Sequence, residues 1–219
     1  MSRPDSQLDR LQALRFIAAA AIVVRHAFME LEQHGIVFPG RDFMLAVPWG
    51  AGVDVFFVIS GFVITFGAVG KQPSAGAAGD FIVRRLIRLW PTYALFTVLM
   101  LVAMAILPDM LNHSTIDPAH TAASFAFIPW PEPGDGTYYP VLGQGWTLNY
   151  EMFFYVCFAA TMFAPPRLRP AILWAGGVSL IATGLIWKLP PPLHFYADPI
   201  VLEFLFGVAL AVLYRRWSF

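Results

Sequence analysis

Several titratable side chains stand inside apolar stretches of the sequence, among them His26, Asp54 and Glu151. A charged side chain at the centre of a membrane-spanning helix costs at least ~2.5 to 3.5 kcal/mol, so a residue kept there is a candidate for function. An imidazole exchanges protons near neutral pH, and a carboxylate can orient it and stabilise its charged form. We therefore predict an acid/base cluster with His26 and Glu151 as catalytic residues and Asp54 in support. The alternative is that each side chain reaches out to nearby water.

Arginines form a second candidate site. Arg85 and Arg88 are three residues apart and so share a helix face, from which they could grip phosphate groups. Arg15 precedes His26 by eleven residues, or ~17 Å along a helix axis. An anion held by these arginines could therefore reach His26 only on a long flexible arm. Taken alone, the basic cluster of Arg84, Arg85 and Arg88 is better explained as a signal for membrane topology and a contact for anionic lipid.

The composition indicates that lipid is the solvent. Hydrophobic residues make up 58% of the chain and charged residues 13%, whereas soluble domains carry about half and roughly a quarter. The 14 basic and 14 acidic residues balance, so no basic surface is expected and we predict no nucleic-acid partner. Cys157 is the only cysteine, which argues against a disulfide framework or a thiolate metal site, and we predict no metal.

Six segments are apolar enough to cross a bilayer, whose core of about 30 Å needs roughly 20 helical residues. We therefore predict an all-α fold, a polytopic transmembrane helical bundle with about six spans. His26, Asp54 and Glu151 each lie three to five residues from the outer end of a span, which places them at a shared depth of ~5 to 8 Å. The spans are expected at 11–29, 49–69, 89–107, 146–164, 171–187 and 199–214, the last two being shorter.

The positions of Lys and Arg predict the orientation. Ten lie in loops or termini on one side of the predicted membrane, and only Arg41 and Lys188 on the other. Cytoplasmic loops carry the positive excess, so both termini are predicted to be cytoplasmic and the loop 108–145 extracytoplasmic. A cleaved signal peptide is disfavoured, because Arg25 and His26 stand where a small-residue cleavage site would be expected. The aromatic residues of the loop could stack on a sugar, but an interfacial aromatic belt is the commoner explanation. The ten residues are Arg3, Arg10, Lys71, Arg84, Arg85, Arg88, Arg167, Arg169, Arg215 and Arg216.

Five segments in order resemble the acyltransferase-3 family of integral membrane acyltransferases, and the similarity covers nearly the whole chain. Arg15 and His26, with ten residues between them, match the family's motif in the first span, and Arg85 with Arg88 matches its paired arginines. Glu151 matches the acidic residue of a tryptophan-led segment, whose wording is closest to the branch that acetylates bacterial exopolysaccharides. The segments are LQALRFIAAAAIVVRHA (11–27), GVDVFFVISGFVIT (52–65), RRLIRLWPTY (84–93), GWTLNYEMFFY (145–155) and LEFLFGVALA (202–211).

The resemblance implies an enzyme of the bacterial inner membrane that takes an acyl group, usually acetyl, from cytoplasmic acyl-CoA to a hydroxyl of a glycan or lipid-linked sugar. Acyl-CoA would be a co-substrate, with no bound cofactor. Arg15, Arg85 and Arg88 would then face the CoA phosphates, and His26 and Glu151 the acceptor near the outer face. Family members usually carry several more spans, so we expect residues 1–219 to be one domain that is truncated at its C-terminus.

Two other classes of function compete with an enzyme. In a proton-coupled transporter or flippase of glycan precursors, the intramembrane His, Asp and Glu would form a proton relay. Paired spans broken at the bilayer midplane would favour that class, and the sequence has no such Gly or Pro breaks. A structural or assembly subunit would tolerate replacement of His26 and Glu151.

Overall fold

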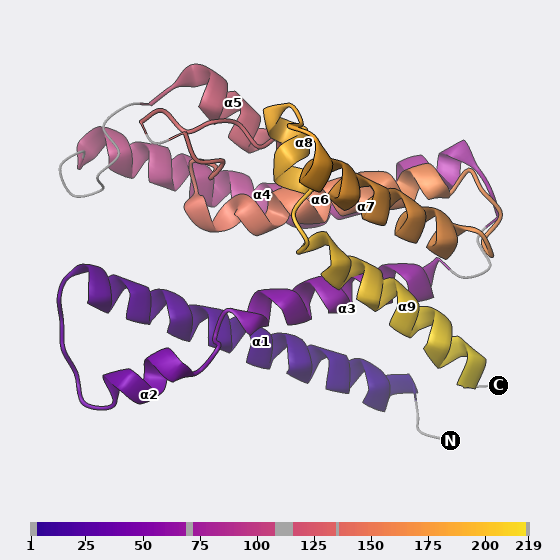
Figure 1. Cartoon of the computed structure of the whole chain (residues 1–219), viewed down its shortest axis with the longest axis horizontal. Coiled ribbons are helices and arrows are strands. Elements are labelled where there is room, and N and C mark those ends of the chain that lie inside the picture. The colour runs from indigo at the N-terminus through magenta and orange to yellow at the C-terminus, as the bar shows by residue number, and fades with distance from the viewer. Residues whose placement is uncertain (1–3, 69–71, 108–115, 135, 218–219) are drawn as a thin grey trace. The chain divides into compact units, whose positions relative to one another are not determined.

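The computed structural model describes residues 4–68, 72–107, 116–134 and 136–217, and its regular elements within these ranges are all helical. The all-α prediction is therefore confirmed. The chain divides into two compact units, Met1–Gly67 with Glu203–Phe219 (unit 1) and Ala68–Leu202 (unit 2). Each unit is described by itself below, and Figure 1 labels its elements. Arg3 and Lys71, which entered the orientation argument, lie outside the described residues.

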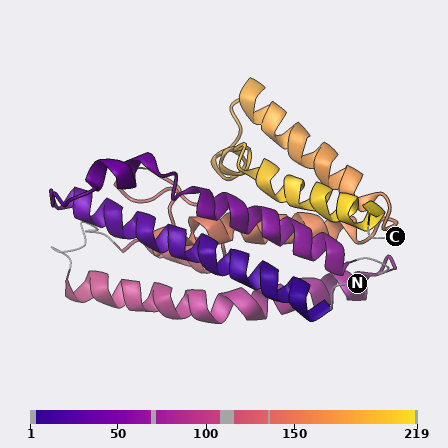
Figure 2. The same ribbon diagram turned by 90° about the horizontal axis from the view of Figure 1, so that it is seen from below.

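Unit 1 is built on two long helices, α1 (Pro4–Gln33) and α3 (Ala51–Gly67), which pack side by side and run in opposite directions (Figures 1 and 2). The alanine-rich sequence around residues 18–21 favours helix, because Ala has the highest helix propensity. The helices of the unit are α1 (Pro4–Gln33), the short α2 (Arg41–Ala46), α3 (Ala51–Gly67) and α9 (Val201–Trp217), of which all but the first two residues belong to unit 1.

Glycines bring α3 and α9 into backbone contact. A Cβ atom at Gly61 would overlap the carbonyl of Phe204, and one at Gly207 would overlap the carbonyl of Val58. The ring of Phe57 stacks on that of Phe204, with 4.3 Å between the centroids. Small residues that let backbones approach closely are typical of membrane helix pairs, which gain little from hydrophobic burial in lipid.

Unit 2 is centred on α4 and α6, which pack against each other. Ser74 caps the start of α4, where its side chain accepts a hydrogen bond from the backbone N–H of Ala77. The segment 108–145, expected as a loop, contains a helix and a 3-10 turn in its described part. The elements are α4 (Ala75–Ile106), α5 (Pro118–Phe125), η2 (Gly143–Gly145), α6 (Trp146–Thr161), α7 (Arg169–Ile186) and α8 (Pro191–Tyr196).

Three helical segments of the described chain are long and apolar enough to cross a membrane: Arg41–Gly67, Ala75–Ile106 and Arg169–Ile186. They correspond to the expected spans 49–69, 89–107 and 171–187. The other three expected spans are helical as well, as α1, α6 and α9. However, α6 has 16 residues and α9 has 17, somewhat fewer than the ~20 that a bilayer core requires.

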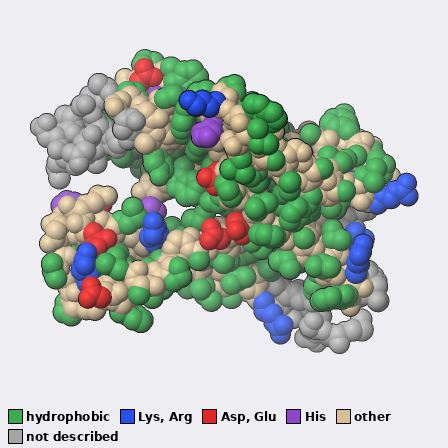
Figure 3. All heavy atoms as spheres, in the orientation of Figure 1, with side chains coloured by type: hydrophobic (Ala, Val, Ile, Leu, Met, Phe, Trp, Pro, Cys, Tyr) green, Lys and Arg blue, Asp and Glu red, His purple; other side chains and the backbone are tan. Residues whose placement is uncertain are grey.

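Large apolar side chains are exposed on the helix surfaces. Leu185 and Ile186 at the end of α7 are 79% and 67% exposed, and Leu95 and Phe96 of α4 are 57% and 52% exposed. Hydrophobic side chains also cover most of the face seen in Figure 3. Soluble monomers rarely expose extended apolar surface. The surface therefore agrees with the composition in indicating a membrane protein.

Candidate functional site

Unit 2 brings three of the predicted site residues together around Tyr155. The guanidinium carbon Cζ of Arg85 lies 5.4 Å from the ring centroid of Tyr155 and 5.4 Å from that of Phe81. The Tyr155 hydroxyl donates a hydrogen bond to the Glu151 carboxylate. Arg88 is close enough for its charge to act on Tyr155. One buried tyrosine therefore connects the predicted donor arginines with the predicted catalytic acid.

The helical repeat explains this arrangement. Phe81, Arg85 and Arg88 are spaced by four and three residues, so they lie on one face of α4. Glu151 and Tyr155 are four residues apart on α6, which brings the hydroxyl to the carboxylate. The ring of Phe81 meets that of Tyr155 edge to face, with 5.9 Å between the centroids. This contact sets the offset of α4 against α6 and so places Arg85 over Tyr155.

The expected separation of the arginines from Glu151 is wrong. We predicted that Arg85 and Arg88 precede a span that starts at residue 89, and that Glu151 lies near the opposite membrane face. Instead, α4 begins at Ala75, capped by Ser74, so the arginines lie inside the helix. Arg85 and Glu151 then meet at the same tyrosine. The arginines do not end the helix, because Arg is a good helix former.

Asn149 is a second polar residue of this region that the sequence analysis missed. Its side chain is fully buried, at 0% exposure, and within the described residues neither its amide nitrogen nor its amide oxygen has a hydrogen-bond partner. A Cβ atom at Gly145, the last residue of η2 and the residue before α6, would overlap the ring of Tyr93 on α4. Asn149 follows Gly145 by four residues, so it lies on the face of α6 toward α4. A buried polar group without a partner costs about 1 to 3 kcal/mol.

In unit 1, Arg15 and His26 lie on the single continuous helix α1. His26 follows Arg15 by eleven positions, which corresponds to ~17 Å along the axis, so the two side chains cannot act on the same atom. The His26 side chain is exposed, whereas Arg15 is half-buried. His26 is therefore accessible for a proton transfer.

The packing register of α1 and α3 changes the expected depth of Asp54. A Cβ atom at Gly52 would press on the carbonyl of Ala18, so these two positions lie level with each other. Because α3 runs opposite to α1, Asp54, two residues further along α3, lies past the level of Ala18 and about 15 Å from His26 along the α1 axis. The predicted shared depth of Asp54 and His26 is wrong, because α1 continues to Gln33 while α3 begins only at Ala51.

A further carboxylate accompanies Asp54 in unit 1. Glu203, in the first turn of α9, is near enough to Asp54 for the two charges to interact. Both side chains are half-buried. Glu203 lies in one of the segments that carry the family resemblance, but its position beside Asp54 depends on the packing of α9 against α3.

The comparison with known proteins defines the class of this protein. Residues 8–219 match the acyltransferase domain of the acyltransferase-3 family, and the chain therefore belongs to that family. No solved structure matches the chain at a significant level.

Two curated relatives share part of the sequence. The chain is similar to "Exopolysaccharide production protein ExoZ" of Rhizobium meliloti (strain 1021), with 35% identity over 161 residues, which are 73% of this chain and 49% of that protein. It is also similar to "Protein 2 in picA locus" of Rhizobium radiobacter, with 34% identity over 141 residues, 58% of this chain and 68% of that protein. The chain thus matches about half the length of the exopolysaccharide protein.

Proposed function

We propose that this chain forms part of an integral membrane acyltransferase that moves an acyl group, acetyl in the first instance, from acyl-CoA to a hydroxyl of an exopolysaccharide or another cell-surface glycan. The observation that carries the proposal is the cluster in unit 2, where Arg85 and Glu151 meet at Tyr155. It combines a cationic group that suits phosphates with a carboxylate that suits proton transfer or hydroxyl binding. The family assignment and the name of the exopolysaccharide relative support the same reaction.

The positive charges of Arg85 and Arg88 remain available for an anion. Within the described residues neither arginine has a carboxylate within salt-bridge distance, whereas the adjacent Arg84 pairs with Asp80 at 3.9 Å. Guanidinium groups bind phosphate through paired N–H donors. We assign Arg85 and Arg88, with Arg15, to the phosphates of the CoA donor.

The proposed reaction is a single acyl transfer. The sugar hydroxyl oxygen forms a bond to the acyl carbonyl carbon, and the carbon–sulfur bond of the thioester breaks. The hydroxyl proton passes to the imidazole of His26 and then to the departing CoA thiolate, so that protons balance. In a two-step variant of the reaction, His26 itself carries the acyl group before the sugar attacks. Glu151, anchored by Tyr155, assists this proton transfer, and Asp54 is a supporting charge.

Transfer of radiolabel from acetyl-CoA to cell-surface polysaccharide tests the proposal, with the full-length protein in membranes. General acid/base catalysis is worth ~10² to 10⁴ in rate, so His26→Ala should lower transfer by that factor without loss of expression. Glu151→Gln keeps the shape, removes the charge and should also be severely impaired. His34→Ala is the matched control, since His34 is exposed and the polar interactions of its ring, within the described residues, are with Glu30.

A double variant tests whether the two residues serve one reaction. Groups that act as a unit give strongly non-additive losses, so His26→Ala combined with Glu151→Gln should be little slower than the slower single variant. Near wild-type transfer by His26→Ala would contradict the proposed role of His26. The competing outcome is that neither the wild type nor any variant transfers label, while the protein moves glycan precursors across the membrane together with protons. The protein would then be a transporter.

Donor binding is tested separately. The double variant Arg85→Gln, Arg88→Gln should bind CoA at least ~10-fold more weakly, because each charged hydrogen bond contributes about 1.5 to 3 kcal/mol. Arg84→Gln is the matched control, since its charge is already paired with Asp80. Equal CoA affinity of the double variant and the control would return the arginines to a role in topology.

The proposed location is the bacterial inner membrane, with both described ends of the chain in the cytoplasm. Reporter fusions after Lys71 and after Asn112, two positions outside the described residues, should then report the cytoplasm and the exterior respectively. The opposite pattern would overturn both the orientation and the side from which CoA binds.

A further inference from the structure

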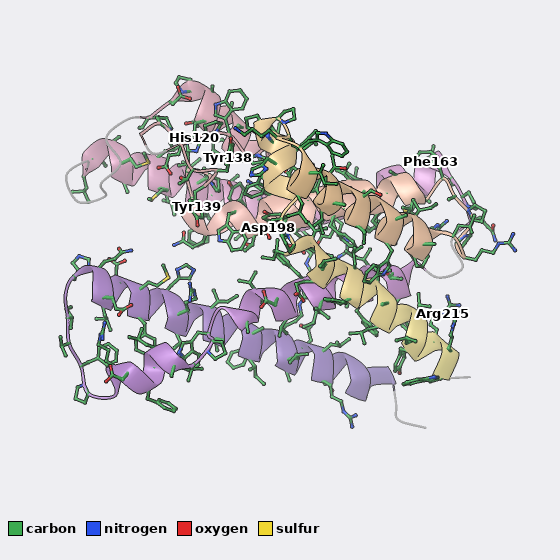
Figure 4. The ribbon with its side chains drawn as sticks, in the orientation of Figure 1. His120, Tyr138, Tyr139, Phe163, Asp198 and Arg215 are labelled. Atoms are coloured by element: carbon green, nitrogen blue, oxygen red, sulfur yellow. The ribbon has the colours of Figure 1, made fainter. Side chains whose placement is uncertain are left out.

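Unit 2 contains a cavity of about 530 Å³. None of the residues that line it belongs to the arginine cluster, which consists of Arg85 and Arg88 with Tyr155 and Glu151. Its walls come from the end of the segment 108–145, the start of α6, the end of α7 and the segment through α8 to Pro199. The volume lies in the range of small-molecule sites, which is roughly 300 to 1,000 Å³. Figure 4 labels three of the lining residues, Tyr138, Tyr139 and Asp198.

Five of the twelve residues that line the cavity carry aromatic rings, and these rings stand at different angles to one another. Tyr150 stacks on Phe195, with centroids 4.4 Å apart and planes inclined by 23°, while Trp146 stands edge-on to Tyr150 at 5.9 Å and 89°. Tyr138 leans on Phe195 at 6.2 Å. The Tyr150 hydroxyl donates to the Phe195 carbonyl at 2.6 Å, which fixes the stacked pair. Such walls offer flat apolar faces in more than one direction, as the C–H faces of a sugar ring require.

Polar groups at the same cavity suit hydroxyl groups. One carboxylate oxygen of Asp198, Oδ1, accepts from the backbone N–H of Ile200 at 2.8 Å, which leaves Oδ2 to accept from a ligand. His194 and Thr137 also line the cavity and can both donate and accept. A few polar groups placed among aromatic walls fix the orientation of a ligand.

The charge of the lining excludes a CoA-like ligand. Neither Lys nor Arg is among the residues that line this cavity, and Asp198 carries a negative charge. A polyphosphate would therefore meet repulsion here, in contrast to the arginine cluster around Arg85. A neutral ligand rich in hydroxyl groups matches both the walls and the charge.

The segment that carries Tyr138 and Tyr139 is held in place by hydrogen bonds. Nε2 of His120 donates to the Tyr139 carbonyl at 2.8 Å, and the Val141 N–H donates to the Ser124 hydroxyl at 3.0 Å. This cavity wall is therefore formed before a ligand arrives, which reduces the entropy lost on binding.

The segment through α8, which also contributes to the cavity, is anchored to the residues that follow α5. The hydroxyl of Tyr196, at the end of α8, donates to the Phe127 carbonyl at 3.2 Å. Burial raises the pKa of Tyr196, which keeps this hydroxyl protonated and able to donate. Phe127 has a φ of 57°, a conformation that non-glycine residues adopt only when their surroundings hold them there, and its ring stacks on Tyr93 with centroids 4.9 Å apart.

We propose that this aromatic cavity binds one neutral sugar unit of the glycan acceptor, with Trp146 as a stacking surface and Asp198 as hydroxyl acceptor. The inference rests on the proposed function for the identity of the glycan as acceptor. Tyr150 is adjacent in sequence to Glu151 on α6, so a sugar held in the cavity lies within about one helical turn of the proposed catalytic carboxylate along the α6 axis. Tyr138 and Tyr139 of the loop 108–145 also line this cavity, so sugar stacking, the less favoured alternative to an interfacial belt, is the role that the proposal gives to these two rings.

Direct binding tests the cavity without turnover. The full-length protein is placed in lipid nanodiscs, because detergents with sugar headgroups would compete. A panel of neutral pentasaccharides (β-1,4-glucan, β-1,3-glucan and α-1,4-glucan) is then titrated, with saturation-transfer NMR as the readout. Trp146→Ala and Asp198→Asn should each weaken binding at least ~10-fold, because the first removes a stacking surface and the second a charged hydrogen-bond acceptor. Trp130→Ala is the matched control, because Trp130 is 45% exposed and does not line the cavity.

The outcomes separate this inference from the proposed function. Binding that is lost in Trp146→Ala and Asp198→Asn but kept in Trp130→Ala supports the cavity. Absence of binding of every oligosaccharide to the wild type, equal binding by all three variants, or displacement of the sugar by CoA overturns it. Acetyl transfer with an unchanged KM for glycan in Trp146→Ala would refute the cavity while the proposed function stands. If the wild type binds sugar but transfers no acetyl group, the cavity stands as a sugar site and the proposed acyl transfer is refuted.

Discussion

The helices of unit 1 and the helices of unit 2 pack, each within its own unit, through different kinds of contact. In unit 1, α3 and α9 meet backbone to backbone at Gly61 and Gly207, and the candidate residue His26 is exposed. In unit 2, aromatic rings and hydrogen bonds connect the helices, and the candidate residues Arg85 and Glu151 are joined by a buried tyrosine. Glycine contacts bring helices close but leave no room for a substrate between them. Aromatic contacts leave irregular spaces with polar groups, and both the arginine cluster and the aromatic cavity lie in that unit.

The largest expected effect comes from adding one methyl group in unit 1. Gly61→Ala or Gly207→Ala places a Cβ atom inside a neighbouring backbone carbonyl, so the helices must separate along their length and lose more than the ~1 to 3 kcal/mol typical of overpacking. We expect a large loss of folded protein, measured by size-exclusion chromatography and thermal unfolding in detergent. Gly67→Ala on the same helix is the control, because no atom lies within 4 Å of its Cβ position. Wild-type stability of Gly61→Ala would show that unit 1 does not depend on close backbone contact.

A smaller effect is expected at the tyrosine that joins the cluster in unit 2. Tyr155→Phe keeps the ring next to Arg85 and removes the hydrogen bond to Glu151. A hydrogen bond to a charged group contributes about 1.5 to 3 kcal/mol, so acyl transfer should fall ~10- to 100-fold, while CoA affinity should stay within about twofold. Transfer kinetics and CoA titration of the same preparation measure the two effects. A parallel loss of both would mean that the hydroxyl serves only to hold the helices together.

The smallest effects distinguish paired from unpaired buried polar groups in unit 2. Thr97 and Asn149 are both 0% exposed, but the Thr97 hydroxyl donates to the Tyr93 carbonyl at 2.8 Å and Asn149 has no partner within the described chain. Thr97→Val should therefore lose about 1 kcal/mol of unfolding free energy, and Asn149→Leu should lose nothing or gain a similar amount. Thermal melts of both variants in one lipid environment measure the difference. Destabilisation by Asn149→Leu greater than that of Thr97→Val would show that the amide does have a partner.

Much of the helical framework could be predicted from apolar run length. The expected span 146–164 corresponds to α6 and 171–187 to α7, with end points that agree within three residues. The start of α4 could not be predicted in this way, because the helix begins fourteen residues before the apolar run and carries three arginines in its first half. A search for apolar runs detects the part of a helix that faces lipid and stops at charged residues, even where the backbone continues as helix.

The sequence by itself determined the class of the protein and which residues share a helix face. Composition indicated lipid as the solvent, and the spacing of Arg85 with Arg88 placed both on one face of a helix, because the 3.6-residue repeat depends only on local geometry. Only the tertiary structure decided which faces meet. The contact of Phe81 with Tyr155 sets how far α4 slides along α6, and the fit of Gly52 against Ala18 sets the same offset for α3 and α1. Such offsets arise from the packing of side chains between helices, which no local repeat specifies. For that reason only the fold reveals the position of Tyr155 between Arg85 and Glu151, the lack of a hydrogen-bond partner for Asn149 within the described residues, and the aromatic cavity.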